Sequence, residues 1–536
     1  MAQANIEDPA AATASNPYQT VLKKHRAAVS IKTPWLSLFQ ECFDYTMPLR
    51  EAPYGMTPGD DNMEHIFDET GMVGVEEFVS RLKDGMMPAF QVFSQLTAGT
   101  DTPPEERENM NVLLDEVTEF VFETINESNF HTEVIESMFD MSVSVGTLAV
   151  YENDPKEVTP FYCQALPMAH MNFRDGPFGK IGFWSRVRTM QCGEIKIAYP
   201  DAKLSTGLSR LIREDEMKDV ELIECIYQDY TKEVETFKYY LLFEPDQAIL
   251  LEDEWVGIGS NSWISFRWHK LAGETWARGP VIKALPSIRT ANLVTQMTLE
   301  NAEIAMSGIY TAEDDGTLNV NNVRLLAGTI VPISPGSAGL RAINGAGNFD
   351  VSELVLNELR NNIRKALYNE VLGAPTGTPM SAREVSERMQ ELYRIAGPNF
   401  VRLISELIDP FIKRVIFILR KRGLIDLPAV NGREVSIKAD SPLANSQDQN
   451  DVVSFGHFAE LVGAAYGPEA LMMATKKDDV IPWLAQKLSF PGKFIRSEEE
   501  QAAMMKEMQA GQNEQTTDNQ NAGEEAGGNV LPLPTG

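Results

Sequence analysis

The sequence predicts an α+β fold that is predominantly helical, and three observations support this prediction. Long segments have apolar residues at steps of three and four, which is the spacing of an amphipathic helix. Between residues 144 and 270 the apolar residues alternate instead, and β-branched and aromatic types are frequent, as in strands. From residue 280 the helical spacing returns on both sides of a glycine-rich insert.

The N-terminal part is expected to be helical after a short disordered segment. Residues 1–17 are rich in Ala, Asn and Pro, a composition typical of disordered chain. A stretch rich in Gly, Pro and Asp predicts a loop at 50–65. The expected helices are 18–47, 71–86, 103–125 and 130–141, and residues 91–97 are expected to form a strand or its approach.

The region 144–270 is expected to be mostly antiparallel sheet. The expected strands are 145–152, 159–164, 181–190, 220–230 and 234–244, with a short helix at 206–217. Several aromatic side chains here could stack on nucleic acid bases, but their positions in alternating strands favour packing in a core. These residues are Trp263, Trp268, Trp276, Tyr239 and Tyr240.

Two further helices are predicted on either side of the insert. Residues 281–306 are expected to form the first, although Pro286 makes its first turn uncertain. Residues 349–372 are expected to form the second, with Asp350 as its cap. The insert has short strand candidates at 308–312, 323–326 and 329–333. The two helices could stand side by side as an antiparallel pair with the insert at their tip. Such a shape would leave apolar surface exposed in a single subunit and so implies an oligomer.

A long amphipathic helix is predicted from Ser381 to Gly423. Ser381 and Glu384 form a capping box at its start, and Gly423 offers a left-handed cap at its end. At ~1.5 Å per residue this helix would be roughly 60 Å long. Pro398 and Pro410 each remove a helix N–H and should bend it. We therefore expect a bent strut shared between sub-domains or subunits.

The C-terminal part is expected to be a strand followed by shorter helices. The strand is predicted at 433–438 and the helices at about 450–466, 468–473, 481–488 and 497–508. Residues 509–536 are polar and of low complexity, which predicts disorder in isolation.

Composition excludes some classes of protein and leaves others open. The chain has 536 residues and a net charge of -30, which argues against tight binding of nucleic acid because affinity for phosphates comes mainly from basic patches. It does not exclude a protein past which DNA slides. No apolar run approaches the length that spans a bilayer, and the N-terminus does not look like a signal peptide. The four cysteines are isolated, so we expect reduced core residues.

No catalytic, cofactor or metal signature is found in the sequence. The segment Gly176–Lys180 is the nearest approach to a phosphate-binding loop, but its spacing is wrong and it has no hydroxyl residue. The acidic run Glu313-Asp314-Asp315-Gly316 lacks the spaced ligands of a calcium loop, so a solvated turn is favoured. Neither an enzyme nor a cofactor is expected. The six histidines stand alone and are expected to be surface or packed residues: His25, His65, His131, His170, His269 and His457.

Four stretches resemble the head-to-tail connector, or portal, proteins of short-tailed double-stranded DNA bacteriophages. They are Arg26…Trp35…Tyr45…Pro48 with 81–96, then 128–152, 267–292 and 381–415. None is a catalytic signature, but their order and spacing are fairly specific, and the resemblance extends over about residues 18–508. The chain departs from the family pattern at Trp276-Ala277, where the family usually has Tyr-Gly.

The resemblance implies a portal-type subunit that assembles into a ring, with wing, stem, clip and crown regions. The wing would be 18–280 together with the long helix and following strand at 381–445. The stem helices would be 281–306 and 349–372, the clip 307–348, and the crown 446–508. These regions would be flanked by a disordered N-terminus at 1–17 and a disordered tail at 509–536. A tunnel loop at 373–380 would lie at the channel constriction, with Gly373, Ala374, Pro375, Thr376, Gly377, Thr378 and Pro379 as its site residues.

Candidate contacts with DNA lie on the second stem helix. Arg360, Arg364 and Lys365 recur at helical spacing and could make sparse phosphate contacts. Salt bridges between subunits are an equally open interpretation of these residues, with Glu353, Glu358 or Glu370 as partners. Arg324 and Arg341 are candidate contacts of the clip.

The resemblance further implies a function and a set of partners. The ring, a homo-oligomer of twelve copies in the family, would sit at one capsid vertex in the virion after assembly in the host cytoplasm. It would conduct double-stranded DNA and contact terminase, a tail adaptor, the major capsid protein and a scaffolding protein, with no membrane. Two alternatives remain open, namely another ring-forming tail or capsid component that does not conduct DNA, and an enzyme with an unrecognised site.

Overall fold

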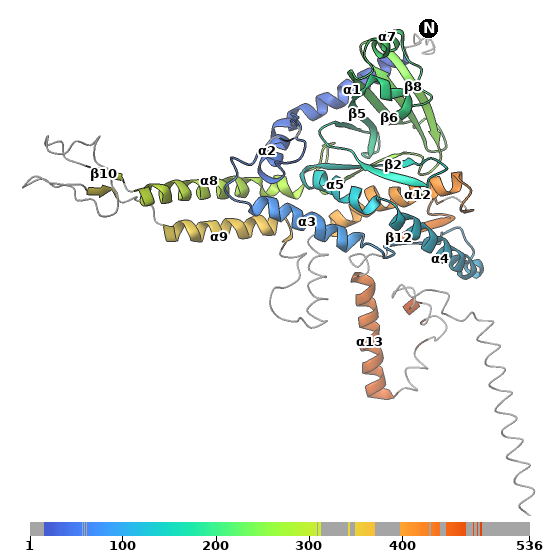
Figure 1. The fold of residues 1–536 in the computed structure, drawn as a ribbon. Helices are drawn as coiled ribbons and strands as arrows, with labels where there is room; N and C mark the ends of the chain where they lie inside the picture. Colours follow the sequence, from blue (N-terminus) through green and yellow to red (C-terminus); the bar gives the residue numbers. More distant parts are fainter. Residues whose placement is uncertain are drawn as a thin grey trace, which may run out of the picture.

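The computed structural model describes a mixed helical and sheet body from which a pair of helices projects (Figure 1). The structure describes residues 16–307 except 56, 58, 60 and 61, then 309–311, 341–343, 349–369, 397–427, 430–439, 446–467 and the isolated positions 475, 480 and 483–484. Helix exceeds strand, as the sequence predicts for an α+β chain.

The N-terminal helices lie where apolar spacing places them. They are α1 (Pro17–Lys32), the 3-10 turn η1 (Thr33–Trp35), α2 (Leu36–Thr46), α3 (Thr70–Met86), α4 (Pro104–Glu127) and α5 (Phe130–Val143). The apolar faces of α2, α3, α4 and α5 share one core, whose fully buried members include Phe39, Phe78 and Phe130. The predicted helix 18–47 is thus confirmed with one interruption, at the turn that contains Pro34.

Two antiparallel sheets form the α+β unit. The larger has the strand order β4-β5-β6-β7-β8, and the smaller the order β3-β2-β9. The larger consists of β4 (Met171–Asp175), β5 (Ile181–Gln191), β6 (Asp219–Gln228), β7 (Thr236–Phe243) and β8 (Ala248–Val256). The smaller consists of β2 (Val145–Glu152), β3 (Phe161–Ala165) and β9 (Trp263–Arg267), while η2 (Cys192–Glu194), α6 (Ile195–Ala198) and α7 (Thr206–Glu214) connect β5 to β6.

Packing confirms the core prediction for the aromatic residues of this unit. All five candidates for base stacking are buried, and Trp276 stacks edge-on against Phe173 with a centroid separation of 5.0 Å. They are therefore core residues. The four cysteines are also buried and unpaired, as predicted.

The strand β1 (Ser94–Ala98) pairs in antiparallel fashion with β12 (Val435–Ala439). This pairing joins two segments far apart in the sequence, both of which the sequence predicts to be strands. Helix α13 (Ser446–Tyr466) follows in the segment predicted to be helical.

The described part of the long helix contains a π-helical turn. Residues 397–403 are helical, η3 (Ile404–Ile408) is π-helical, and α12 (Asp409–Lys421) completes the segment. The π turn immediately precedes Pro410, whose missing N–H and bulky ring disfavour a regular α-helix there. Gly423 has φ +69°, which confirms the predicted left-handed cap. Ser381 and the capping box lie outside the described residues.

The predicted helical pair is present. Figure 1 shows α8 (Pro280–Ser307) and α9 (Phe349–Ala366) side by side, extending from the body, with the strand β10 (Ile309–Thr311) beyond their far end. There β10 pairs with β11 (Arg341–Ile343). Helix α8 continues through Pro286, so its first turn is intact. The strand candidates 323–326 and 329–333 lie outside the described residues.

The sequence prediction is wrong at one helix end and omits several strands. Helix α9 ends at Ala366 rather than continuing to residue 372, because Tyr368 has φ +61°, a left-handed conformation that no α-helix can include. Four strands of the sheets were not predicted: β4, β8, β9 and β11. Strand β8 is an edge strand in which all residues but Leu250 are partly or fully exposed, so its apolar residues do not alternate clearly.

Candidate functional site

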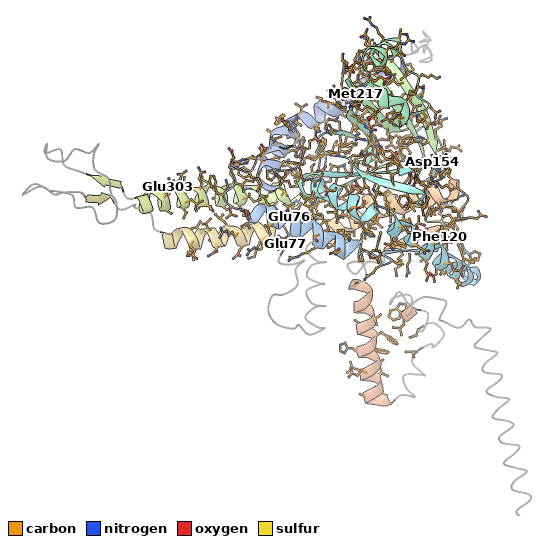
Figure 2. All side chains as sticks on the ribbon, in the orientation of Figure 1. Glu76, Glu77, Phe120, Asp154, Met217 and Glu303 are labelled. Carbon is orange, nitrogen blue, oxygen red and sulfur yellow. The ribbon has the colours of Figure 1, made fainter. Side chains whose placement is uncertain are left out.

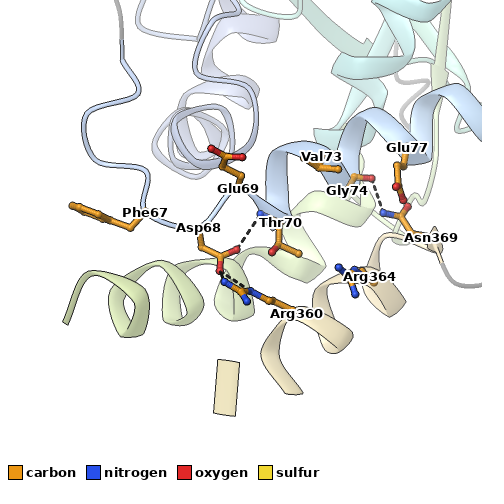
Figure 3. Close-up of a pocket in the computed structure, with 10 residues that line it drawn as sticks. All are labelled: Phe67, Asp68, Glu69, Thr70, Val73, Gly74, Glu77, Arg360, Arg364 and Asn369. Carbon is orange, nitrogen blue, oxygen red and sulfur yellow. Dashed lines mark hydrogen bonds and ion pairs between the residues drawn. The ribbon is translucent and has the colours of Figure 1, made fainter. Parts of the chain in front are cut away.

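The candidate site lies where the helical pair meets the body. The turn Phe67–Thr70, which leads into α3, is held by one residue from each helix of the pair. Asn292 on α8 accepts hydrogen bonds through Oδ1 from the backbone N–H groups of Phe67 (2.6 Å) and Asp68 (3.1 Å). Arg360 on α9 donates to Asp68 Oδ2 from Nε (3.0 Å) and Nη2 (2.9 Å) (Figure 3). The turn thus fixes both helices to the body.

Asp68 is buried, and its charge is balanced locally. The carboxylate also accepts a hydrogen bond from the backbone N–H of Thr70 through Oδ1 (3.0 Å), which closes an Asx turn just before α3. Burial raises the pKa of Asp68, but the hydrogen bonds from Thr70 and Arg360 outweigh burial and leave the pKa below its usual value. Asp68 is therefore ionised at neutral pH and needs Arg360 as its partner.

The end of α9 is fastened to α3 by a second set of contacts. Asn369 donates from Nδ2 to the carbonyl oxygen of Gly74 (3.0 Å), and Arg81 donates to the carbonyl oxygen of Asn369 (2.7 Å). The Leu367 side chain packs so closely on Gly74 that a Cβ there would lie 2.6 Å from Leu367 Cδ1. A larger residue at position 74 would therefore force the end of the Leu367 side chain to shift.

The three candidate DNA contacts do not form one cluster. Arg360 and Arg364 line a surface cavity of about 390 Å³, together with acidic residues Glu69 and Glu77 of the α3 region (Figure 3). Lys365 is exposed and does not line it. Arg360 forms an ion pair with Asp68, whereas neither Arg364 nor Lys365 has a charged partner among the described residues. Only the latter two offer an available positive charge.

Arg360 has an acidic partner within its own chain, and the predicted salt bridges between subunits stay a prediction. The acidic partner of Arg360 in the described chain is Asp68, 292 positions away in sequence, and neither Glu353 nor Glu358. Glu370, the tunnel-loop residues 373–379 and Arg324 lie outside the described residues, and Arg341 begins β11.

Sequence reasoning missed Asp68, Asn292 and Asn369. Each acts through a contact with a segment more than 200 residues distant, and no local motif marks it. The only local signal is the aspartate two residues before Thr70, which is typical of an Asx turn and does not indicate an arginine partner.

The described part of the chain has neither a metal cluster nor a helix suited to a membrane. No group of three or more His, Cys, Asp or Glu side chains there could hold a metal ion. Among the same residues, no helix combines the length and the apolar character needed to cross a bilayer.

Comparison with known proteins gives similarity over most of the chain. A probable portal protein of Bordetella phage BPP-1 is 22% identical over 464 residues, which are 82% of this chain and 81% of that protein. Two solved assemblies contain similar chains: the virion of a native gene transfer agent particle (TM-score 0.39, 11% identity) and the neck of an empty particle of this kind (TM-score 0.38, 12% identity). Each alignment covers 79% of this chain and 94% of the other.

The family described as "Bacteriophage head to tail connecting protein" matches residues 18–495. This family is structural and non-enzymatic. Because the match extends over nearly the whole sequence, the chain belongs to the bacteriophage head-to-tail connecting protein family.

Proposed function

We propose that this chain is a portal subunit that forms a ring of twelve copies at one capsid vertex, through which double-stranded DNA enters during packaging and leaves during ejection. The observation that supports this best is the α8–α9 pair, which projects from the body with a two-stranded tip and is fixed at its base by Asn292 and Arg360. At ~1.5 Å per residue, the 28 residues of α8 extend about 42 Å. Copies of such a pair around an axis would enclose a channel.

The regions take their proposed roles from the resemblance to portal proteins. The pair α8–α9 is the stem, 307–348 the clip, 373–380 the tunnel loop, 446–508 the crown, and 18–280 with 381–445 the wing. Arg324 and Arg341 would contact partners at the clip. The proposed partners are terminase, which would supply the ATP-driven motor, a tail adaptor, the major capsid protein and a scaffolding protein.

Charge fits a channel that conducts DNA without holding it. Each chain has a net charge of -30, so a ring would repel phosphate on average, subject to screening by salt. Arg364 and Lys365 would provide sparse phosphate contacts on the stem. Arg360 would contribute mainly by holding the stem in place, because its guanidinium is already paired with Asp68.

Electron microscopy of the purified full chain tests the proposal. We expect twelve-fold rings with a central hole wide enough for duplex DNA, and no ATPase activity. Monomers or closed discs would contradict it. If capsids with a plugged ring package DNA as well as capsids with an open ring, the chain is instead a structural virion component that does not conduct DNA.

A charge-neutral variant tests the DNA contacts. Arg364→Gln with Lys365→Gln should leave ring assembly intact and change the retention of DNA in filled heads. The control is Lys156→Gln with Lys218→Gln, which removes the same charge from exposed positions on the body. Loss of rings in the first variant alone would show that these residues join subunits.

A further inference from the structure

Helix α4 presents an exposed face that mixes apolar and acidic side chains. Leu113, Glu116, Phe120, Glu123 and Glu127 follow one another at steps of three and four, so they form a single line along the helix, here called the α4 face. Leu113 and Phe120 are 63% and 37% exposed, and the three carboxylates are exposed as well. Figure 2 shows Phe120 at the edge of the body, on the helix that extends furthest from the sheets on that side.

The opposite side of α4 already has its packing partners. Leu114, Val121, Phe122 and Ile125 are buried against the body, and Thr118 accepts a hydrogen bond from the backbone N–H of Leu96 on β1 (3.2 Å). The helix therefore does not need the α4 face for its own folding. Apolar residues seven positions apart on an exposed face are the pattern of a helix that packs against another helix.

The charges of the α4 face lack compensation. Glu116, Glu123 and Glu127 have no cationic partner among the described residues. Moreover, the last turn of α4 contains no basic residue and ends in Glu127, so carboxylates lie at the negative end of the helix dipole. Cations placed along this face would relieve the repulsion among the carboxylates and their repulsion by the negative end of the helix dipole.

A shallow hollow adjoins the C-terminal half of the α4 face. It has a volume of about 440 Å³ and is lined by Phe90, Val92 and Phe122, with Glu123 and Glu127 at its rim. Phe90 is 82% exposed and has φ +59°, and its backbone N–H donates to Asn126 Oδ1 on α4 (3.3 Å). An exposed aromatic ring beside a hollow with an acidic rim suits an apolar side chain that is flanked by basic ones.

We propose that the α4 face docks a basic, amphipathic helix of a partner protein, with apolar residues seven apart and Lys or Arg between them. The apolar residues would pack on Leu113 and Phe120 and enter the hollow beside Phe90, while the basic ones would pair with Glu116, Glu123 and Glu127. This interaction is separate from DNA conduction, since a face with this charge repels phosphate.

Fluorescence anisotropy with a labelled peptide of about 20 residues tests the proposal on the full chain at about 150 mM salt. The peptide has Leu at every seventh position and Lys at the flanking positions. We expect saturable binding, weakened at least tenfold by Leu113→Ser and at least tenfold by Glu116→Gln with Glu123→Gln and Glu127→Gln. These exposed substitutions should leave the melting temperature unchanged.

A charge-matched control separates docking from general attraction to an acidic protein. Glu157→Gln with Glu216→Gln and Glu233→Gln removes three charges from exposed positions elsewhere, and should change the affinity less than twofold. The proposal is overturned if wild type does not bind the peptide, if the control weakens binding as much as the α4 variant, or if Leu113→Ser has no effect.

Discussion

Arg267 on β9 and Glu406 in the π-helical turn η3 form a buried, two-pronged ion pair. Arg267 donates from Nε to Oε2 (3.1 Å) and from Nη2 to Oε1 (2.8 Å), and its side chain is 2% exposed. The guanidinium also donates to the carbonyl oxygen of Thr275 (3.2 Å). The pair thus links the small sheet to the irregular turn of the long helix at the point where Pro410 prevents a regular one.

Breaking this pair should destabilise the chain strongly. Among the described residues, Glu406→Ala would leave the buried guanidinium with only Asp175 at 3.5 Å as a carboxylate neighbour. Removal of one partner of a buried pair costs ~3 kcal/mol or more. Glu406→Gln keeps one acceptor and should cost about half as much. Urea denaturation followed by tryptophan fluorescence measures both. Equal stability of wild type and Glu406→Ala would contradict the structural role.

Lys32 provides a second buried cation with a structural role. Its Nζ donates to the carbonyl oxygens of Met168 (2.9 Å), Ala169 and Met171 (3.0 Å), which lie just before and at the start of β4. Burial lowers the pKa of Lys32 to about 8, so the ammonium remains protonated at neutral pH. Lys32→Met should cost about 3 kcal/mol through loss of these charged hydrogen bonds. Lys23→Met, an exposed change on the same helix, should alter the denaturation midpoint little.

These two residues show what the sequence could and could not predict. Helices and most strands follow from apolar spacing, because each buries one face, and the helical pair around the insert follows from two such segments separated by glycines. Lys32 and Arg267, however, lie in those same segments without any local mark of burial. Their acceptors are backbone carbonyls and a carboxylate more than 130 residues away, and only the tertiary fold brings them together.

In the candidate site too, the sequence predicts the helix and its basic residues but not their tertiary contacts. Spacing on α9 singles out Arg360, Arg364 and Lys365 equally, but the fold pairs only Arg360 with a buried carboxylate. The early end of α9 was also unpredictable, since nothing local requires Tyr368 to adopt a positive φ. Its ring packs near Phe78 and Trp268, which are distant in sequence, and these contacts stabilise the strained backbone.

Asp140 on α5 should make stability depend on pH. Burial raises its pKa to about 6, although Arg50, Lys32 and a hydrogen bond from the Met168 N–H (2.7 Å) oppose this rise and Glu136 adds to it. Between about pH 4 and pH 6 the folded state holds a proton that the unfolded chain has released, so the free energy of unfolding falls as pH rises through this window.

Asp140→Asn removes this titration while its side-chain oxygen can still accept from Met168. Relative to wild type, the variant should gain up to about 3 kcal/mol between pH 4 and pH 7, since one pKa unit corresponds to about 1.4 kcal/mol. Denaturation of both proteins at several pH values measures the difference. A constant difference across this range would show that Asp140 does not titrate there.

Gly279 should be irreplaceable at the start of the helical pair. A Cβ at this position would lie 1.9 Å from the carbonyl oxygen of Ser142, and the Gly279 N–H donates to the carbonyl oxygen of Val143 (2.8 Å). Gly279→Ala would therefore force backbone apart at the origin of α8, at a cost of about 3 kcal/mol or more. Gly273→Ala is the comparison, because a Cβ there meets nothing within 4 Å and only the positive φ opposes it. It should cost about 1 kcal/mol.

Arg360→Gln should loosen the base of the helical pair without unfolding the body. The substitution leaves the buried Asp68 carboxylate without its cation, but the Arg360 side chain is 38% exposed and water can replace part of its interaction, so we expect a loss of about 1–2 kcal/mol. Since hydrogen bonds lower the pKa of Asp68, this contribution is present above about pH 4 and is lost as pH falls through the folded pKa of Asp68.

Hydrogen exchange of Arg360→Gln at neutral pH should accordingly be faster than that of wild type in α9 and in the turn before α3. Arg364→Gln, one helical turn further along α9 and without an acidic partner in the described chain, should leave both segments as protected as in wild type. Unchanged exchange in Arg360→Gln would mean that Asn292 and Asn369 hold the pair on their own.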